Sequence, residues 1–458
     1  MGESSGLKKA LPIWWLYTLA VGAVVGDGIF TFTGYAVASA GPSVIIAYII
    51  AGLSQLFLMI SFGELAVWRP SAGGPEPWVS ELLNNKKLGF LSSISFSIGW
   101  IIAGGTVSLA IGTYVYNLLS YGGVHLENQA LWVTIFAMIF ASLFAILNIV
   151  GVVIAAGTQF ILTVILIAIM VVYAISATPY IKPENYSPFM PNGLPGLLGA
   201  IPIGVYAYMG ASTVLFAGEE AKNPVDIAKV LLWSSITFVV VYTWALAACV
   251  GTLPYSEVVV FYQAIYAASA EKIWGPVAGA IMTFGAWLAA ATCLLMGTMY
   301  QPARDLYNLA RQGYKVPRFF GYVHPRFRTP VWGVVFVWII SIILILLGTF
   351  VGQTMGYQLL GYELVWAWVV SWFLTLLAAY RFRRKYKDLI PKLPWRVPGW
   401  PVTPALGMFG ILLTVFAMFY DLSNSYGLEV SAVTGVISIA WVLILYLLAG
   451  YILTKERR

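Results

Sequence analysis

Long apolar segments recur along the whole 458-residue chain. A helix needs about 20 consecutive apolar residues to cross the hydrocarbon core of a bilayer. Only 9% of the residues are charged, against about 25% in soluble domains. We therefore expect an all-α integral membrane protein with twelve transmembrane helices, each satisfying its own backbone hydrogen bonds in lipid. The expected spans are residues 12–40, 42–68, 89–119, 129–149, 152–178, 196–218, 227–253, 275–303, 330–350, 357–380, 402–420 and 431–453.

The basic residues divide unevenly between the two sides that this topology creates. With the N-terminus inside, the inner side receives seven Lys and Arg before residue 230, six in residues 304–328, seven in residues 381–396 and three in the tail, which is 23 of 25. Lys182 and Lys272 fall outside. The positive-inside rule then predicts a multi-pass protein of the cell membrane with both termini in the cytoplasm. Basic loops on an anionic leaflet explain the net charge of +7, so we expect no nucleic-acid partner.

The first span is interrupted near its centre by Gly26-Asp27-Gly28. Glycine lowers helix stability by roughly 1 kcal/mol relative to alanine, and an acid at mid-membrane costs at least ~2.5 kcal/mol. The glycines fit two interpretations: a helix break that lines a polar cavity, or the small-xxx-small spacing of Gly22 and Gly26 that lets helices pack closely. Asp27 favours the break, because an ionisable residue inside the membrane is a functional-site hypothesis by default.

The sixth span repeats this interruption, with Gly210 and small hydroxyl residues in the middle of its course. Interrupted helices at matching positions of two halves are typical of transporters built from inverted repeats, with the binding site between them. We expect one transporter domain over residues 1–458, with five-helix repeats over 12–178 and 196–380 and two further helices over 402–453. The candidate substrate-binding residues, from spans one, three and six, are Gly26, Asp27, Gly28, Ile29, Ala103, Gly104, Tyr206, Tyr208, Gly210 and Ser212.

Two further acids lie within the spans. Glu64, about one turn from the inner end of span two, fits a gate or a proton relay, but we favour an interfacial acid paired with a basic residue. Glu363, about two turns from the outer end of span ten, either lines an outer vestibule as a coupling candidate or forms structural hydrogen bonds. After span two, residues 76–87 alternate apolar and polar side chains, which predicts a short helix on the inner surface.

Signals for catalysis or metal binding are weak. Cys249 and Cys293 lie in spans seven and eight, where we expect small buried side chains. His125 and His324 both lie in loops, so we expect no metal site and no cofactor. A membrane enzyme would need a nucleophile paired with a base, or a set of metal-binding acids. We therefore expect that the protein is not an enzyme.

Four stretches, in register within this topology, resemble the amino acid, polyamine and organocation permeases. The first break resembles their G-x-G-I-F element at Gly26–Phe30. The others are Glu64 followed by Pro70–Gly74, the run Gly218–Pro224, and the stretch from Arg304 to Pro330. Together they cover spans one to nine. The resemblance implies a LeuT-like fold of two inverted five-helix repeats with two added helices.

The resemblance also implies how a substrate is held. In such permeases, backbone groups at the two broken helices bind the substrate's carboxylate and amine, and an aromatic residue of span six closes over it. By position that residue is Tyr206, whose alternative role is an interhelical tyrosine. Two positions depart from the pattern: Asp27 replaces a residue that is usually small, and Leu166 stands where several proton-coupled relatives have a lysine. Asp27 is therefore a candidate either to carry a coupled proton or to neutralise a substrate amine.

These observations predict a secondary transporter of amino acids or related organic amines that works by alternating access. Its coupling would be to protons, as a symporter, or to a counter-substrate, as an antiporter. Two alternatives stay open: a transporter of polyamines or other decarboxylated cations, which Asp27 and Glu363 favour, and a sensor that binds substrate without moving it. The expected partners are the small-molecule substrate, the coupling ion or counter-substrate, and the lipid bilayer.

Overall fold

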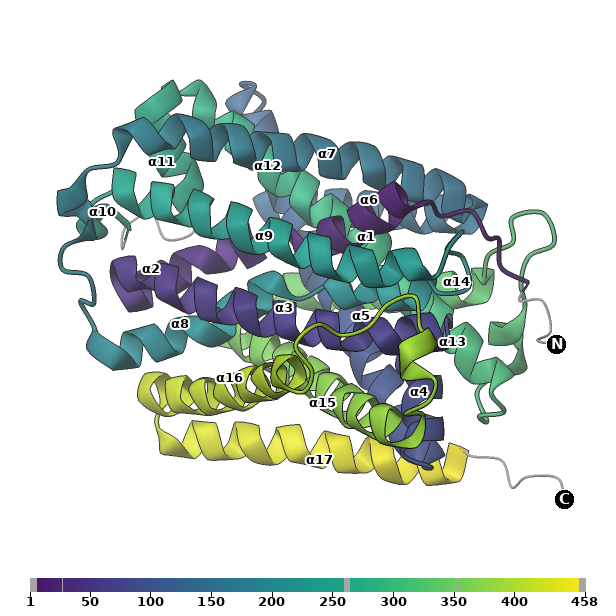
Figure 1. Ribbon diagram of the computed structural model, residues 1–458. Coiled ribbons are helices and arrows are strands. Elements are labelled where there is room, and N and C mark those ends of the chain that lie inside the picture. Colours follow the sequence, from purple (N-terminus) through teal and green to yellow (C-terminus); the bar gives the residue numbers. More distant parts are fainter. Residues whose placement is uncertain (1–5, 27, 259–263, 352–354, 453–458) are drawn as a thin grey trace, which may run out of the picture.

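The computed structural model describes residues 6–26, 28–258, 264–351 and 355–452 as a bundle of helices. Most helices run lengthwise in the view of Figure 1, with α16 and α17 along one side. Within the described ranges no strand forms, and one β-bridge joins Leu11 to Ala221. The α-helices are α1 (Ile13–Val24), α2 (Thr33–Ala40), α3 (Val44–Trp68), α4 (Glu76–Leu82), α5 (Lys86–Tyr121), α6 (Gln129–Val150), α7 (Val152–Ala177), α8 (Gly193–Tyr208), α9 (Val225–Thr252), α10 (Tyr255–Val258), α11 (Ile265–Trp274), α12 (Val277–Thr292), α13 (Gln301–Arg311), α14 (Val331–Val351), α15 (Met355–Lys385), α16 (Val402–Tyr426) and α17 (Leu428–Ile452). The shorter 3₁₀ and π segments are η1 (Gly28–Phe32), η2 (Gly41–Ser43), η3 (Thr178–Tyr180), η4 (Pro183–Tyr186), η5 (Ala211–Ala217), η6 (Cys293–Thr298), η7 (Arg318–Gly321) and η8 (Ile390–Lys392).

Eleven helical segments of the described ranges are long and apolar enough to cross a membrane, and α1 is a shorter apolar helix. One of the eleven, Gly28–Trp68, joins parts of two expected spans across the turn η2. At this turn Gly41 adopts φ +60°, which glycine tolerates without strain. The protein therefore has the all-α membrane architecture that the sequence predicts. The count of twelve spans and the inverted-repeat relation stay predictions.

The first span is broken where the sequence predicts the break. α1 ends at Val24, the backbone at Val25 is extended (φ −75°, ψ 90°), and a π-helical segment begins at Gly28. A Cβ atom at Gly26 would lie 2.6 Å from Sγ of Cys293, so glycine lets the chain pass close to η6. Asp27 itself lies outside the described residues.

The sixth span is also broken. α8 ends at Tyr208 and the 3₁₀ helix η5 begins at Ala211. Between them Gly210 has φ +122°, a backbone conformation that other residues rarely adopt. A Cβ atom at Gly210 would lie 2.1 Å from the carbonyl oxygen of Ala23 in α1. The two breaks therefore meet backbone to backbone, which requires glycine at this position.

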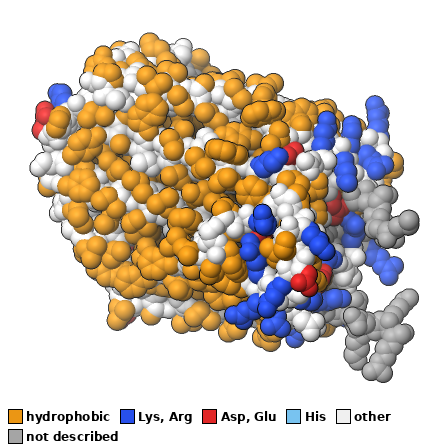
Figure 2. Space-filling model, viewed as in Figure 1, with side chains coloured by type: hydrophobic (Ala, Val, Ile, Leu, Met, Phe, Trp, Pro, Cys, Tyr) orange, Lys and Arg blue, Asp and Glu red, His pale blue; other side chains and the backbone are white. Residues whose placement is uncertain are grey.

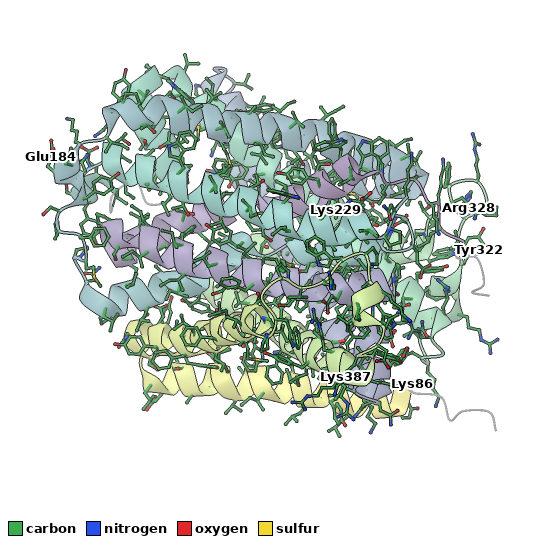
Figure 3. The ribbon with its side chains drawn as sticks, viewed as in Figure 1. Lys86, Glu184, Lys229, Tyr322, Arg328 and Lys387 are labelled. Carbon is green, nitrogen blue, oxygen red and sulfur yellow. The ribbon has the colours of Figure 1, made fainter. Side chains whose placement is uncertain are left out.

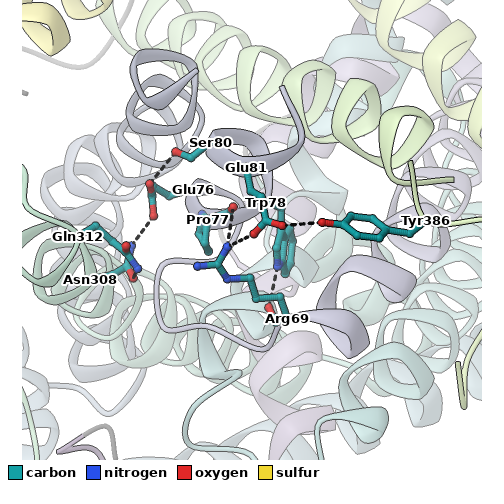
Figure 4. A network of polar contacts seen from close by, with 9 residues as sticks. All are labelled: Arg69, Glu76, Pro77, Trp78, Ser80, Glu81, Asn308, Gln312 and Tyr386. Atoms are coloured by element: carbon teal, nitrogen blue, oxygen red, sulfur yellow. Dashed lines mark hydrogen bonds and ion pairs between the residues drawn. The ribbon is translucent and has the colours of Figure 1, made fainter. Parts of the chain in front are cut away.

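The segment after span two differs from its prediction. α4 is a short helix, as expected, but five of its seven residues are buried, among them Trp78 and Val79, so it is packed into the protein rather than lying on it. Glu76 in this helix accepts hydrogen bonds from Ser80 and Asn308 (Figure 4). Because the carboxylate of Glu76 finds partners within the protein, this end of a segment that is too polar for lipid packs away from water.

Two buried carboxylates, Glu64 and Glu220, form ion pairs. Glu64 binds Arg383 of α15, which confirms the pairing expected from the sequence. Glu220 binds Arg304 at 3.1 Å, and both side chains are 0% exposed. Arg304 was expected among the inner loops, and instead it is enclosed by protein.

Charged and apolar surfaces are separated along the bundle. Figure 2 shows a broad apolar surface, with Lys and Arg gathered at one end of the molecule. Lys86, Arg328 and Lys387 lie at that end, and Glu184 lies at the opposite end (Figure 3). An apolar belt between polar ends is typical of a multi-pass membrane protein. Which end faces the cytoplasm stays a prediction.

Candidate functional site

A small cavity lies where the two broken helices meet. Its volume is ≈ 30 Å³, about the share of one water molecule in the liquid and far below the roughly 300 Å³ at which ligand sites begin. A substrate of ordinary size therefore fits only when the surrounding helices move apart. The cavity is lined by Ala23, Val24, Gly26, Gly28, Trp100, Ala103, Val107, Tyr206, Met209, Cys293, Leu364 and Trp368.

Two long helices supply most of the side chains in its walls. Trp100, Ala103 and Val107 of α5 are spaced three and four residues apart, which puts them on one helical face. Leu364 and Trp368 of α15 share a face for the same reason. The rings of Trp100 and Trp368 meet edge to face with centroids 5.3 Å apart. The walls are therefore aromatic and aliphatic.

Hydrogen bonds connect the walls to the broken segments. Nε1 of Trp100 donates to Oγ1 of Thr213 in η5 at 3.1 Å. Sγ of Cys293 donates to the carbonyl oxygen of Ala23 in α1 at 3.2 Å. Because each bond joins a wall residue to one of the broken spans, movement at either break changes the shape of the cavity.

Among the described residues, helix ends supply the charge at the site. The described lining contains no Lys, Arg, His, Asp or Glu. α1 and α8 end beside the cavity at Val24 and Tyr208 and direct partial negative charge toward it, whereas the helical run from Gly28 to Ala40 begins there and directs partial positive charge. A small molecule with one positive and one negative group matches this arrangement.

Four residues predicted from the sequence line the cavity: Gly26, Gly28, Ala103 and Tyr206. A Cβ atom at Gly28 would lie 2.9 Å from Cα of Ala207 in α8. A larger residue at Gly28 would therefore push the two broken spans apart. Both glycines of the first break are thus positions of close approach.

The remaining predicted residues that the structure describes do not line the cavity. Ile29 and Ser212 are fully buried, and Oγ of Ser212 has no hydrogen-bond partner among the described residues. Gly104 faces α14, and Tyr208 stacks on an aromatic ring of α9. Gly210 forms the crossing between the two breaks and does not line the cavity.

Glu363 of α15 lies in another contact. Its carboxylate accepts a hydrogen bond from Oγ of Ser438 at 2.8 Å and one from Nε1 of Trp441 at 3.0 Å, both in α17. These bonds correspond to the structural role among the two that the sequence left open.

Sequence reasoning missed several residues that face the cavity. Val107, Cys293, Leu364 and Trp368 are apolar residues on apolar helices, and nothing in their local sequence separates a cavity-facing side chain from a lipid-facing one. Trp100 stands within a glycine-rich part of span three, and that composition was the available signal.

A model of the family described as amino acid permease matches residues 16–458. The chain belongs to the amino acid permease family. The branched-chain amino acid permease BcaP of Bacillus subtilis (strain 168) is 28% identical over 428 residues, covering 90% of this chain and 89% of the relative. The methylthioribose transporter of the same organism is 27% identical over 415 residues (88% and 87%). The gamma-aminobutyric acid permease of that organism is 23% identical over 460 residues, covering 96% of this chain and 94% of the relative.

Family membership confirms the resemblance to the amino acid, polyamine and organocation permeases. This permease is therefore a multi-pass membrane transporter of the amino acid class and not an enzyme. The place where its two broken spans meet is the candidate site for substrate.

Proposed function

We propose that this permease moves neutral amino acids with large apolar side chains across the cell membrane by alternating access through the cavity between its breaks. The observation that carries this proposal is the lining, which combines three aromatic rings with aliphatic side chains and has no charged side chain among the described residues. A charged substrate side chain in such a pocket would lose its hydration without gaining a partner.

Backbone groups at the helix ends recognise what all amino acids share. The helical run that begins at Gly28 favours the substrate carboxylate, and the ends of α1 and α8 favour its ammonium group. Each such end contributes about 0.3–1 kcal/mol when exposed and up to ~2 kcal/mol when partly buried. These groups bind the zwitterion and leave selectivity to the walls.

The walls select the substrate side chain. Trp100 and Trp368 form an aromatic corner, and Val107 and Leu364 extend it with aliphatic surface. Burial of an apolar side chain against these walls contributes about 25 cal/mol for each Å² removed from water. The relative named as a branched-chain amino acid permease, at 28% identity, supports the same class of substrate.

Transport requires movement at the breaks, because the cavity is smaller than any amino acid side chain of this class. The close backbone crossing at Gly210 and the close approach at Gly28 are the positions where the two broken spans turn against each other. Tyr206 packs on Phe32 with ring centroids 4.7 Å apart. We assign Tyr206 the role of gate, since its ring must leave this contact when the spans separate.

Asp27 is the coupling candidate that we retain, as the carrier of a proton in symport, with exchange for a counter-substrate as the alternative. Glu363 is bonded to α17, so we assign it a structural role. A second candidate function, transport of polyamines or other decarboxylated cations, is favoured by Asp27, because this acid stands between two glycines that line the cavity. Orientation with both termini in the cytoplasm follows from the basic residues.

Binding of matched ligand pairs tests the substrate class. Purified permease is heated with leucine or isoamylamine, and with lysine or cadaverine, since each second compound lacks only the carboxylate. A ligand at ~100 times its dissociation constant stabilises by about 2.7 kcal/mol, so leucine should raise the unfolding temperature and isoamylamine should not. Stabilisation by cadaverine and not by leucine would establish the cation transporter instead. Stabilisation by leucine without uptake into proteoliposomes would indicate a sensor.

Paired tryptophan variants test the site itself. Trp368→Phe should change the ratio of leucine to phenylalanine uptake, because Trp368 lines the cavity. Trp372→Phe is the matched control, one turn further along α15, equally buried and outside the lining. Equal effects of both variants on selectivity would contradict this site.

Asp27→Asn tests the coupling role. This variant should remove the pH dependence of uptake, and an unchanged pH profile would end the coupling role of Asp27.

A further inference from the structure

A second, larger pocket lies far from the breaks, where α15 ends. Its volume is ≈ 570 Å³. Three cationic side chains line it, Arg383, Lys387 and Arg396, and apolar surface from Ile390, Val397 and Pro398 completes its wall. The transport mechanism proposed above uses none of these residues.

Most of the positive charge in this pocket is not neutralised. Arg383 is paired with Glu64 and lies 4.7 Å over the ring of Trp400, so its position is held from two sides. Lys387 and Arg396 are exposed, and within the described part of the chain neither forms an ion pair. Residues 381–396 contain seven basic residues and one acid, Asp388. The pocket therefore offers two uncompensated cations in a strongly positive segment.

The position of the pocket along the chain also suits a lipid headgroup. It follows directly on a helix that is long and apolar enough to cross a membrane. Lys387 lies at the end of the molecule where the basic side chains gather (Figures 2 and 3). The apolar wall provides a surface for the first carbons of an acyl chain beside the cationic side chains.

We propose that this pocket binds the headgroup of an anionic phospholipid. The phosphodiester oxygens accept hydrogen bonds from the guanidinium of Arg396, which matches a phosphate with two parallel N–H groups, and from the ammonium of Lys387. Basic pockets between transmembrane helices are suited to such headgroups. Glu64 of α3, which pairs with Arg383, also accepts a hydrogen bond from the backbone N–H of Val397 at 2.7 Å. This carboxylate therefore joins α3, α15 and the segment before α16, and it fixes one wall of the pocket.

Lipid binding to the full-length permease in detergent tests the proposal independently of transport. Phosphatidylglycerol is titrated into the protein, with phosphatidylcholine as the neutral reference and inorganic phosphate as the headgroup alone. Lys387→Gln and Arg396→Gln should each weaken phosphatidylglycerol binding roughly fivefold, the factor that corresponds to one basic residue near an anionic surface. Lys392→Gln is the matched control, because Lys392 is an exposed basic residue of the same segment that does not line the pocket.

Thermal unfolding gives a second readout. Phosphatidylglycerol should raise the unfolding temperature of the unmodified permease and of Lys392→Gln, and it should have a smaller effect on the Lys387→Gln/Arg396→Gln double variant. Equal losses in all three single variants would show that general surface charge attracts the lipid, and the pocket proposal would fail. Equal binding of phosphatidylcholine, or binding of inorganic phosphate in place of phosphatidylglycerol, would also overturn it.

Discussion

Breaking the buried ion pair between Arg304 and Glu220 should destabilise this permease much more than breaking an exposed pair. Nε and Nη2 of Arg304 donate to the two carboxylate oxygens at 3.1 Å each, and the hydroxyl of Tyr300 donates to the same carboxylate at 2.6 Å. Both charged side chains are 0% exposed. Glu220→Gln leaves the guanidinium buried without a counter-charge, which costs about 3–5 kcal/mol.

Unfolding of the purified permease measures this cost. The free energy of unfolding is followed by tryptophan fluorescence during titration with a denaturing detergent, for Glu220→Gln, Arg304→Gln and the double variant. Because both single variants break the same interaction, the double variant should lose less than the sum of the two, by roughly 0.5–3 kcal/mol. The control is Glu81→Gln, which removes the partner of Arg69 in a pair whose side chains are 41% and 35% exposed.

The control pair should contribute below about 1 kcal/mol, since exposed pairs are well solvated and screened by salt. A loss in Glu220→Gln no greater than the loss in Glu81→Gln would refute the argument that a buried guanidinium without its counter-charge is costly. Strict additivity in the double variant would refute it as well, because the two residues would then act independently.

Three further predictions concern Gly210 at the break, Cys293 at the cavity and the acid Glu363. Gly210→Ala should abolish folding or transport, because its Cβ atom would lie 2.1 Å from a carbonyl oxygen of α1. The control is Gly157→Ala, because Gly157 has open space around it; this variant should be neutral or stabilise by up to about 1 kcal/mol. Normal uptake by Gly210→Ala would contradict the close crossing of the two breaks. In a Cys249→Ser background, a thiol reagent should inhibit uptake by reacting with Cys293, which lines the cavity. Leucine should slow this reaction. An inhibition rate that leucine does not change would mean that substrate binds elsewhere. Glu363→Gln should keep the pH profile of uptake, and a lost profile would return Glu363 to the coupling role.

Much of the fold was predictable because its signals are local. Apolar runs of membrane length predict helices wherever they occur, and a glycine cluster predicts a break from its own composition. Glu64, near the end of a span, predicted a basic partner because an unpaired charge there is costly. That partner, Arg383, lies 319 positions further along the chain, and no local pattern identifies it.

Part of the candidate site was also predictable from local sequence patterns. Gly26 and Gly28 are recognisable because two glycines close together in an apolar span weaken the helix and predict a break. Leu364 and Trp368 are not recognisable, because lipid tails are as apolar as a protein interior. An apolar side chain on a spanning helix therefore has the same local pattern whether it faces lipid, another helix or the substrate.

The sequence by itself determined that this chain crosses a membrane repeatedly, that two of its spans are interrupted, and that its basic residues gather on one side. Tertiary structure decided which side chains surround the interruptions and which carboxylate meets Arg304. It also decided that the two breaks meet backbone to backbone at Gly210. Hydropathy and helix propensity depend on neighbours along the chain, whereas these contacts depend on how separate helices rotate and pack once they are already in the membrane.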